Sequence, residues 1–422
     1  MNNKFLKTNY LILGAGLSGI AAAFFLNDDF LIIEKQDKIG GLCQTNSYNG
    51  FLYDFTGHLL HFKNNDIKDF VLNKLLKNNY IEQKRNSFVY LKNKYIPFPY
   101  QYNLSYLDNS QITNSILSLL IRPKKKSDSL FDFFLANYGQ KISSDFFIPY
   151  NYKILNFNLK KLHYSQLYKF IPDYEEEKII IGAFIRDKFN DIGYNSIFYY
   201  PAKNGIIELI NSFNINKEKI ILNKYPINIL LNEKKVELND GTIINYNKLI
   251  STIPLPDLLE LLKIKNNLKY SSILNLNILL NEKKIEKIHW LYFPEKKYKF
   301  YRIGFYHNIA EYFCPDKNYS SMYVEASLPK KEENKFIKKI IDQLLELQFI
   351  SSKRNIIKII PQKIKYAFVL FDFYTIKKIK KIRSELAKNE IYLSGRYGNW
   401  EYSSMEENIL NAKELIKKIK CV

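Results

Sequence analysis

The sequence predicts an α/β protein with a discontinuous parallel-sheet domain, an inserted helical domain and a second, antiparallel-sheet domain. Three observations indicate this class. A glycine-rich turn follows a short apolar run near the N-terminus, and residues 106 to about 200 have mostly helical periodicity. A further strand, glycine turn and helix close the chain and repeat the opening pattern, so both ends are expected to belong to one domain.

The glycine-rich turn has the spacing of a dinucleotide-binding unit. Tyr10 to Leu13 form a short buried strand, and Gly14, Gly16 and Gly19 follow as G-x-G-x-x-G before the helical run Ile20 to Leu26. The first glycine makes the bend, the second lets backbone N–H groups approach a pyrophosphate, and the third lets the helix pack on the strand. The N-terminus of the helix then faces the phosphates.

An acidic residue completes this unit. Phe30 to Ile33 form a second apolar run that ends in Glu34, which lies 34 − 14 = 20 positions beyond Gly14, where an acid binds a ribose hydroxyl. The βαβ unit therefore predicts a Rossmann-like domain with a bound dinucleotide, and both NAD and FAD fit it. Gly40 and Gly41 give the pattern Glu-x5-Gly-Gly, which resembles the extended signature of FAD proteins and implies FAD.

Composition excludes several classes of protein. The 422 residues are 46% hydrophobic, as in a globular protein. Cys43, Cys314 and Cys421 have no paired spacing, which argues against a disulfide framework or a zinc site and favours a reducing compartment. No apolar run approaches the roughly 18 residues of a transmembrane helix. We expect a cytoplasmic protein without a transmembrane segment or a metal, and the sequence supports no particular oligomer.

The net charge of +21 comes mostly from lysines scattered among Asn and Ile, as an AT-rich genome would produce, so we expect no nucleic-acid partner. Against this background the seven arginines are informative. Arg302 and Arg396 lie next to aromatic and glycine residues, where a planar, bidentate contact that lysine cannot make is the plausible role.

Further along the chain, His58 follows Gly57, and an imidazole after a flexible glycine can lie close to a ring system. His61, in an apolar context, is better interpreted as a core histidine. The sequence predicts an FAD-binding domain made of three separate segments, 1–85, 200–262 and 371–422. Between them we expect a mostly helical insert on the substrate side at 86–199 and an antiparallel-sheet substrate domain at 263–370.

Several motifs resemble the UDP-galactopyranose mutases, particularly their eukaryotic-type branch, within the wider class of FAD-dependent amine-oxidase and protoporphyrinogen-oxidase-like proteins. The matching stretches are the glycine signature, Gly57-His58, Pro97–Gln101, Pro149–Lys153, Leu249–Pro254, His289–Glu295, Phe300–Arg302 and Gly395–Tyr402. The glycine signature is shared by many flavoproteins. The Trp-Leu-Tyr-Phe-Pro-Glu and Gly-Arg-Tyr-Gly-x-Trp stretches are far more specific.

The resemblance implies an activity. In that family the N5 of reduced flavin attacks the anomeric carbon of UDP-galactopyranose, the ring opens on the flavin adduct and recloses as a furanose, and no net redox occurs. By position, His58 is expected near the flavin N5 edge and Arg302 at the leaving diphosphate. Tyr292 and Tyr402 are expected to hydrogen-bond the phosphates. NAD(P)H is the expected external reductant, and the product would supply cell-surface glycan synthesis.

The resemblance also gives the full set of expected site residues. The expected substrate-binding residues, besides the catalytic Arg302 and His58, are Tyr292, Tyr402, Gln101, Asn151 and Lys169. The expected FAD-binding residues are Gly14, Gly16, Ser18, Gly19, Glu34, Lys35, Gly41, Leu42, His58, Gly395, Arg396 and Met405.

One departure from the family bears on the substrate. The family places a second diphosphate arginine in a Trp-containing segment of the helical domain, whereas Tyr164 to Pro172 contains neither residue. Lys169 could supply a point charge there but not the arginine fork. A later family tyrosine corresponds here to the segment His307 to Ile309.

Two other functions therefore stay open. One is an FAD-dependent oxidoreductase of the same fold that oxidises an amine or a hydrophobic ring system, which fits the 15% aromatic content. The other is a non-catalytic basic flavoprotein that binds a membrane or nucleic acid, although no clustered basic stripe supports it.

Overall fold

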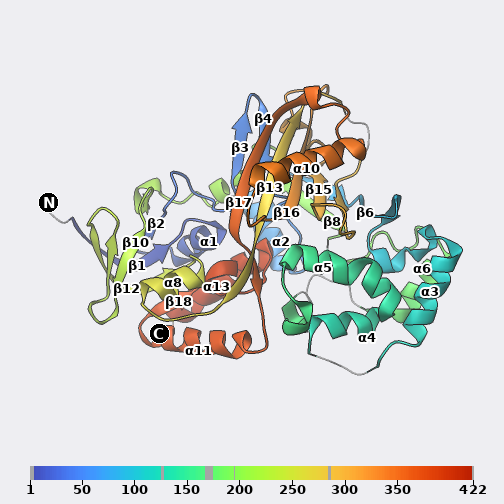
Figure 1. The fold of residues 1–422 in the computed structure, drawn as a ribbon. Helices are drawn as coiled ribbons and strands as arrows, with labels where there is room; N and C mark the ends of the chain where they lie inside the picture. The colour runs from blue at the N-terminus through green and yellow to red at the C-terminus, as the bar shows by residue number, and fades with distance from the viewer. Residues whose placement is uncertain (1–3, 125–127, 167–173, 194, 284–286, 421–422) are drawn as a thin grey trace.

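The structure is a computed structural model that describes residues 4–124, 128–166, 174–193, 195–283 and 287–420. Figure 1 shows three regions. A sheet that includes the first and the last strand of the chain lies at the left, a second sheet rises in the centre, and a group of helices lies at the lower right. The predicted fold class, an α/β protein with a discontinuous Rossmann-like domain, a helical insert and an antiparallel sheet, is confirmed.

The first sheet is built from three separate stretches of chain. Its strands are β1 (Phe5–Leu13), β2 (Phe30–Ile33), β9 (Ile220–Ile221), β10 (Pro226–Leu230), β11 (Lys235–Leu238), β12 (Ile243–Ser251) and β18 (Ile391–Leu393). The order is β10-β11-β12-β1-β2-β9, and β18 also pairs with β12. β1 lies parallel to β2 and β12, and β12 parallel to β18. The two ends of the chain therefore meet in one sheet.

Helices cover both faces of this sheet. On one face α1 (Leu17–Leu26) packs against α13 (Met405–Lys420), over inward side chains such as Ile12 and Ile32. On the other face α8 (Leu255–Leu261) and α11 (Thr375–Lys388) cover Leu11 and Leu13. Alternate strand residues point to opposite faces, so the continuous apolar run of β1 is what a strand buried on both sides requires.

The second sheet is mainly antiparallel. Its order is β17 (Ile356–Leu370), β13 (Lys269–Leu280), β16 (Ser320–Ser327), β15 (Arg302–Phe305), β14 (Trp290–Tyr292), β6 (Ser87–Leu91) and β7 (Lys94–Pro97). β14 and β6 form a parallel pair. The hairpin β6–β7 joins this sheet although the predicted division at residue 86 assigns it to the helical insert. The boundaries themselves stay predictions.

The two faces of the second sheet have different partners. Leu276, Ile303 and Val324 pack beneath the amphipathic helix α10 (Glu333–Glu346). Because side chains alternate along a strand, their neighbours Arg302 and Glu325 emerge on the opposite face. That face turns toward the first sheet and carries the polar side chains described below.

The helical region contains α3 (Asn109–Leu120), α4 (Leu130–Ile142), α5 (Ile148–Leu155) and α6 (Glu176–Phe184). α5 contacts the second sheet through Lys153, whose ammonium donates to the carbonyl oxygens of Phe293 at 2.7 Å and Glu295 at 3.1 Å. These hydrogen bonds hold the end of α5 against the loop between β14 and β15.

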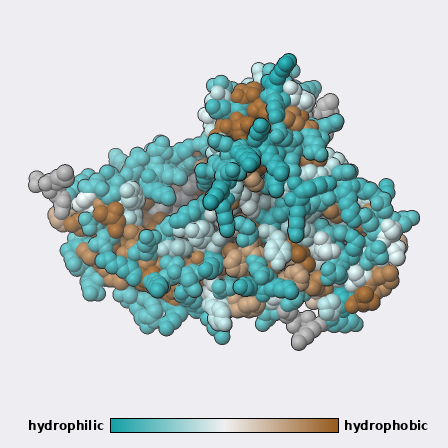
Figure 2. All heavy atoms as spheres, in the orientation of Figure 1, coloured by the Kyte–Doolittle hydropathy of each residue, from teal (hydrophilic) through white to brown (hydrophobic). Residues whose placement is uncertain are grey.

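Short elements join the regions. They are the hairpin β3 (Thr45–Tyr48) and β4 (Phe51–Asp54), the pair β5 (Tyr80–Lys84) and β8 (Ile197–Pro201), and the helices α2 (Asn65–Asp69), α7 (Ile207–Ser212), α9 (Tyr306–Ile309) and α12 (Gly395–Gly398). The face in Figure 2 is mostly hydrophilic, with smaller hydrophobic areas. Among the described residues, none of the helices combines the length and the apolar character needed to cross a bilayer.

Candidate active site

A cavity of about 1080 Å³ lies where the two sheets and the helical region meet. Ligand pockets are typically about 300–1,000 Å³, so this cavity is large for a single small ligand. Its wall includes the glycine turn after β1, the His58 turn, α5, strands β14 to β16 of the second sheet, and the segment from Arg396 to Asn408. Segments far apart in the sequence therefore line one space.

The glycine turn forms one end of the cavity. Gly14 has φ +98°, which favours glycine, and a Cβ there would lie 2.6 Å from Thr252 Oγ1. α1 begins after Gly16, whose position offers no side-chain cap to the first N–H groups of the helix. These uncapped donors at a helix N-terminus suit an anionic group such as a pyrophosphate.

Glu34 lies at the end of β2 beside this turn and is 7% exposed. Its Oε2 accepts a hydrogen bond from the Ala15 N–H at 2.7 Å, and its Oε1 accepts one from the Gln36 N–H at 2.9 Å. The two bonds fix the carboxylate, and each oxygen keeps a further lone pair for a hydroxyl donor. The turn, the uncapped helix and this acid fit the adenosine diphosphate portion of a dinucleotide.

The His58 turn forms the middle of the wall. Thr56 has φ +69°, an unusual conformation for a β-branched residue, and such strain often marks functional sites. Gly57 follows, and a Cβ there would overlap with the hydroxyl of Tyr323. Burial lowers the pKa of His58 to about 4, and the charges of Arg396 and Arg302 act in the same direction. The imidazole is therefore neutral near pH 7.

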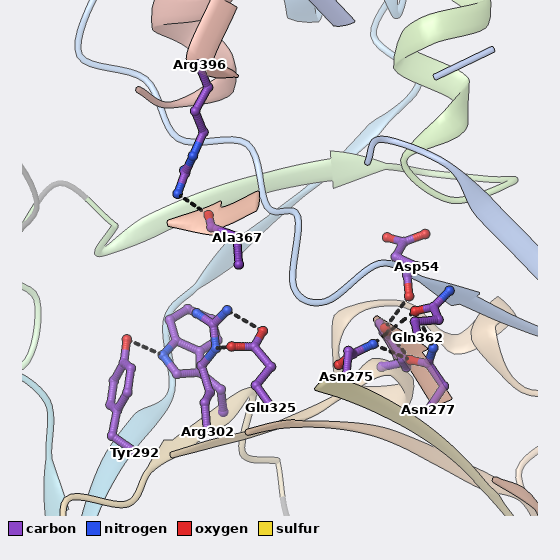
Figure 3. A network of polar contacts seen from close by, with 11 residues as sticks. Asp54, Asn275, Asn277, Tyr292, Arg302, Glu325, Gln362, Ala367 and Arg396 are labelled. Atoms are coloured by element: carbon purple, nitrogen blue, oxygen red, sulfur yellow. Dashed lines mark hydrogen bonds and ion pairs between the residues drawn. The ribbon is translucent and has the colours of Figure 1, made fainter. Parts of the chain in front are cut away.

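The C-terminal segment from Arg396 to Asn408 forms a further part of the wall. Arg396 donates from Nη2 to the Ala367 carbonyl at 3.0 Å (Figure 3). Its guanidinium carbon lies 4.1 Å from the ring centroid of Tyr402. Its Nε is buried and meets no hydrogen-bond partner among the described residues. Glu406 Oε1 accepts from the N–H groups of Lys63 and Asn64 at 2.7 and 2.6 Å. These bonds tie α13 to the chain just after the His58 turn.

Arg302 enters the cavity from β15 and is paired with Glu325 on β16. Arg302 Nε lies 3.0 Å from Glu325 Oε2, and Nη2 lies 2.5 Å from Oε1, so the pair is bidentate (Figure 3). Glu325 is 1% exposed, whereas 27% of the Arg302 side chain is exposed. The pair uses two of the five guanidinium N–H groups, which leaves donors for an anionic ligand.

An aromatic wall adjoins this pair. Tyr292 accepts a hydrogen bond from Trp290 Nε1 at 2.7 Å, and its ring lies 4.9 Å from Phe98 and 5.4 Å from Tyr150. Gln101 lines the same region, and its Nε2 is buried without a hydrogen-bond partner in the described ranges. An unpaired amide donor on the cavity wall is available to a ligand acceptor.

Most of the predicted site residues line this single cavity. Those on its wall are Gly14, Gly16, Ser18, Glu34, Lys35, Gly41, Leu42, His58, Gln101, Asn151, Tyr292, Arg302, Arg396, Tyr402 and Met405. Of the seven arginines, all of which the structure describes, only Arg302 and Arg396 do so. Arg85, for example, donates from Nη2 to backbone carbonyls of Asn190 and Ile192. The individual roles stay predictions.

Three of the predicted site residues are not among the described residues that line the cavity. A Cβ on Gly19 would overlap with the carbonyl oxygen of Gly14, so this glycine serves the packing of α1 on the turn. A Cβ on Gly395 would overlap with Ser18 Oγ, so Gly395 lies behind the wall and lets α12 approach α1. Lys169 lies outside the described residues.

Sequence reasoning did not single out Tyr323 and Glu325, which the structure places on the wall. Their signal was present, because Glu325 is the only charged residue of its strand and Tyr323 lies two residues before it, on the same face. Among the described residues, no group of three or more His, Cys, Asp or Glu side chains could hold a metal ion.

A polar network lies beside the cavity (Figure 3). The Tyr306 hydroxyl lies 3.0 Å from the carbonyl oxygen of Asp54 and 2.9 Å from Asn277 Oδ1, and Asn277 Nδ2 donates to Gln362 Oε1 at 2.8 Å. Burial raises the pKa of Asp54 to about 7, although hydrogen bonds from Thr45 and Tyr200 oppose that shift. The network joins β4, just before the His58 turn, to the second sheet.

Comparison with known proteins bears on the fold. Residues 12–73 match the family model of an NAD(P)-binding Rossmann-like domain. A crystal structure of reduced UDP-galactopyranose mutase superposes with a TM-score of 0.90 at 22% identity, over 98% of this chain and 96% of that one. The chain has the fold of UDP-galactopyranose mutase. The resemblance noted from the sequence motifs is thus confirmed at the level of the fold.

Related folds include oxidases. A putative protoporphyrinogen oxidase from Exiguobacterium sp. 255-15 matches with a TM-score of 0.74 at 15% identity, over 100% of this chain and 99% of that one. Wild-type putrescine oxidase bound to putrescine matches with a TM-score of 0.66 at 13% identity, over 99% and 100% of the two chains. The fold by itself therefore accommodates more than one chemistry.

The neutral His58 predicts a pH dependence of stability. Its pKa is about 4 when folded against a usual 6.5, so the folded state binds fewer protons between these values and stability falls as the pH is lowered through that window. We expect His58→Gln to reduce the loss of unfolding free energy between pH 7 and pH 5 by about 1 kcal/mol, allowing for partial exposure to the cavity.

Urea unfolding at both pH values measures this difference. His163→Gln, outside the cavity, makes the same substitution elsewhere and is the matched control for it. Equal pH dependence in wild type and His58→Gln would show that the imidazole is not held neutral.

Proposed function

We propose that the protein is a flavin-dependent isomerase that interconverts UDP-galactopyranose and UDP-galactofuranose, or a close sugar analogue. The observation that carries the proposal is the Arg302 guanidinium, which faces a large cavity and keeps donors beyond its pair with Glu325. An arginine fork is suited to a diphosphate, where charge develops as the sugar leaves. The glycine turn and Glu34 on the same wall support a dinucleotide beside it.

Each region of the wall has a separate task in this proposal. Gly14, Gly16 and Glu34 bind the adenosine diphosphate of FAD, and Arg396 with Met405 contacts the flavin end. When bound and reduced, for example by NAD(P)H, the flavin supplies the nucleophilic nitrogen for the reversible transfer of the sugar from UDP. Neutral His58 offers a hydrogen bond near pH 7 without adding a positive charge.

Substrate binding follows from the remaining residues. Arg302 holds the diphosphate, and Tyr292 and Tyr402 add hydroxyl groups close to it. Gln101 and Asn151 provide amide groups among aromatic rings, an arrangement that suits a nucleobase. Because two hydrogen bonds to Glu325 already orient the Arg302 guanidinium, it needs little reorganisation as charge appears on the leaving group.

A second candidate is an FAD-dependent oxidoreductase. The observation that favours it is the aromatic wall of Phe98, Phe146, Phe147 and Tyr150, which also suits a hydrophobic ring system. The Tyr164 to Pro172 segment also lacks the second arginine of the mutases. An oxidase substrate would bleach the flavin without a reductant, and oxygen or a quinone would restore the colour.

One experiment separates the two candidates. The FAD-loaded protein is reduced with dithionite and incubated anaerobically with UDP-galactofuranose, and the nucleotide-sugars are separated chromatographically. The proposal predicts the pyranose isomer from the reduced protein and none from the oxidised control. FAD that stays bound and reduced without formation of the pyranose would refute the assignment.

A further inference from the structure

Tyr323 is part of the cavity wall. It is on β16, where Met322 and Val324 point into the core beneath α10, so Tyr323 and Glu325 share the cavity face. Its register partner on β15 is Gly304, and a Cβ at Gly304 would overlap with the tyrosine ring. The ring therefore occupies the space that a side chain at residue 304 would fill.

A second glycine borders the same, hydroxyl-bearing end of the ring. A Cβ on Gly57 would overlap with the Tyr323 hydroxyl oxygen, so the hydroxyl lies directly against the turn that carries His58. Tyr323 is 1% exposed. Two glycines from different regions of the chain thus leave room for one phenol between the second sheet and the His58 turn.

The Tyr323 hydroxyl has no hydrogen-bond partner within the described part of the chain, although it belongs to the cavity wall. Its neighbours differ in this respect. The ring of Tyr306 lies 5.0 Å from that of Tyr323, and its hydroxyl contacts Asp54 and Asn277. The Tyr292 hydroxyl accepts a hydrogen bond from Trp290. Tyr323 is 1% exposed and lines the cavity, so a hydroxyl without a protein partner at this place points to a partner in the ligand.

The position of Tyr323 indicates which portion of the ligand it meets. The Arg302 guanidinium carbon lies 5.8 Å from the centroid of its ring, on the side of the proposed diphosphate. Its hydroxyl lies against Gly57, on the side of His58 and the proposed flavin. In the proposed function the sugar must occupy the space between the diphosphate and the flavin.

We propose that the Tyr323 hydroxyl donates a hydrogen bond to an oxygen of the sugar, and so helps to orient the sugar between Arg302 and the His58 turn. This inference rests on the proposed function and adds a specificity-determining residue to it. Burial raises the pKa of Tyr323 well above its usual range, so the phenol stays protonated and remains a donor.

The test compares Tyr323→Phe with Tyr306→Phe in the FAD-loaded protein. Dissociation constants for UDP-galactose and for UDP alone are measured by calorimetry, together with the thermal midpoint of each variant. Tyr323→Phe should bind UDP-galactose about 5- to 10-fold more weakly, because one hydrogen bond to the sugar is lost. Its affinity for UDP and its thermal midpoint should remain at the wild-type values, because no protein hydrogen bond is lost.

Tyr306→Phe is the matched control, because it removes the same atom from the adjacent buried tyrosine. It breaks the contacts to Asp54 and Asn277, so its thermal midpoint should fall while the ratio of the two affinities stays unchanged. Three results would overturn this inference while leaving the proposed function intact. They are equal UDP-galactose affinity in wild type and Tyr323→Phe, equal weakening of the binding of both ligands, and a fall in the thermal midpoint of Tyr323→Phe. Wild-type protein that binds neither ligand would overturn the proposed function with it.

Discussion

Replacing Arg302 by alanine is expected to lower kcat/KM for the isomerisation of UDP-galactofuranose by about 100- to 1,000-fold, the usual cost of removing one preorganised donor from a developing negative charge. The guanidinium is held by two hydrogen bonds to Glu325, so it is already oriented before the substrate arrives. Steady-state kinetics of the reduced enzyme measure the loss. Arg302→Lys should recover little of it, because a point charge cannot replace the fork.

The same substitution has a separate cost in stability. Glu325 is 1% exposed, and without Arg302 its charge would be buried with no ion-pair partner, which costs about 3–5 kcal/mol when a buried pair is broken from one side. The double variant Arg302→Met with Glu325→Gln removes both charges. It should regain much of the unfolding free energy but not the activity. Arg302→Ala with near wild-type kcat/KM would exclude a role for this side chain at the diphosphate.

Gly16→Ala is expected to weaken FAD binding about tenfold or more while the fold is retained. Gly16 has φ −73°, and the nearest atom to a Cβ there is the Cα of Gly41 at 3.8 Å, an ordinary contact. The protein itself can therefore accept alanine, and the methyl group would meet only a ligand that approaches the backbone closely. Fluorescence titration of the apoprotein with FAD measures the change.

Gly19→Ala is the contrasting variant. A Cβ there would overlap with the carbonyl oxygen of Gly14, so α1 would be forced away from the turn, and we expect a loss of about 1–3 kcal/mol in unfolding free energy. The two glycines thus separate a cofactor effect from a packing effect. FAD affinity unchanged in Gly16→Ala would contradict the assignment of the pyrophosphate to this turn.

The sequence is most informative where one local stretch carries a whole structural unit. The stretch from Tyr10 to Glu34 predicts a strand, a turn, a helix and a second strand, and the structure has β1, α1 and β2 in these places. Arg302 and Arg396 could be singled out because arginine is rare in this lysine-rich chain, and both line the cavity. In both cases the chemical requirement is local and appears directly in the residues.

Features that depend on distant partners were harder to predict. β17 is not indicated by the sequence pattern, because Pro361 interrupts the run, yet the proline is tolerated since β17 lies at the edge of its sheet. The position of Tyr323 depends on the space that two glycines leave for its ring. Gly57 lies far from it in the sequence, and Gly304 lies on the neighbouring strand β15. The role of Glu325 as the ion-pair partner of Arg302 follows only from the strand pairing that places the two residues opposite each other. Only the assembled sheet brings these groups together.

The central claim is that one cavity, walled by both ends of the chain and by the second sheet, holds FAD and presents Arg302 to the diphosphate of a nucleotide-sugar. A crystal structure of the dithionite-reduced protein soaked with UDP tests this most directly. The account predicts FAD along Gly14, Gly16 and Glu34, and a diphosphate oxygen within about 3.2 Å of an Arg302 nitrogen. UDP bound elsewhere, or a cavity that takes up no flavin, would contradict it.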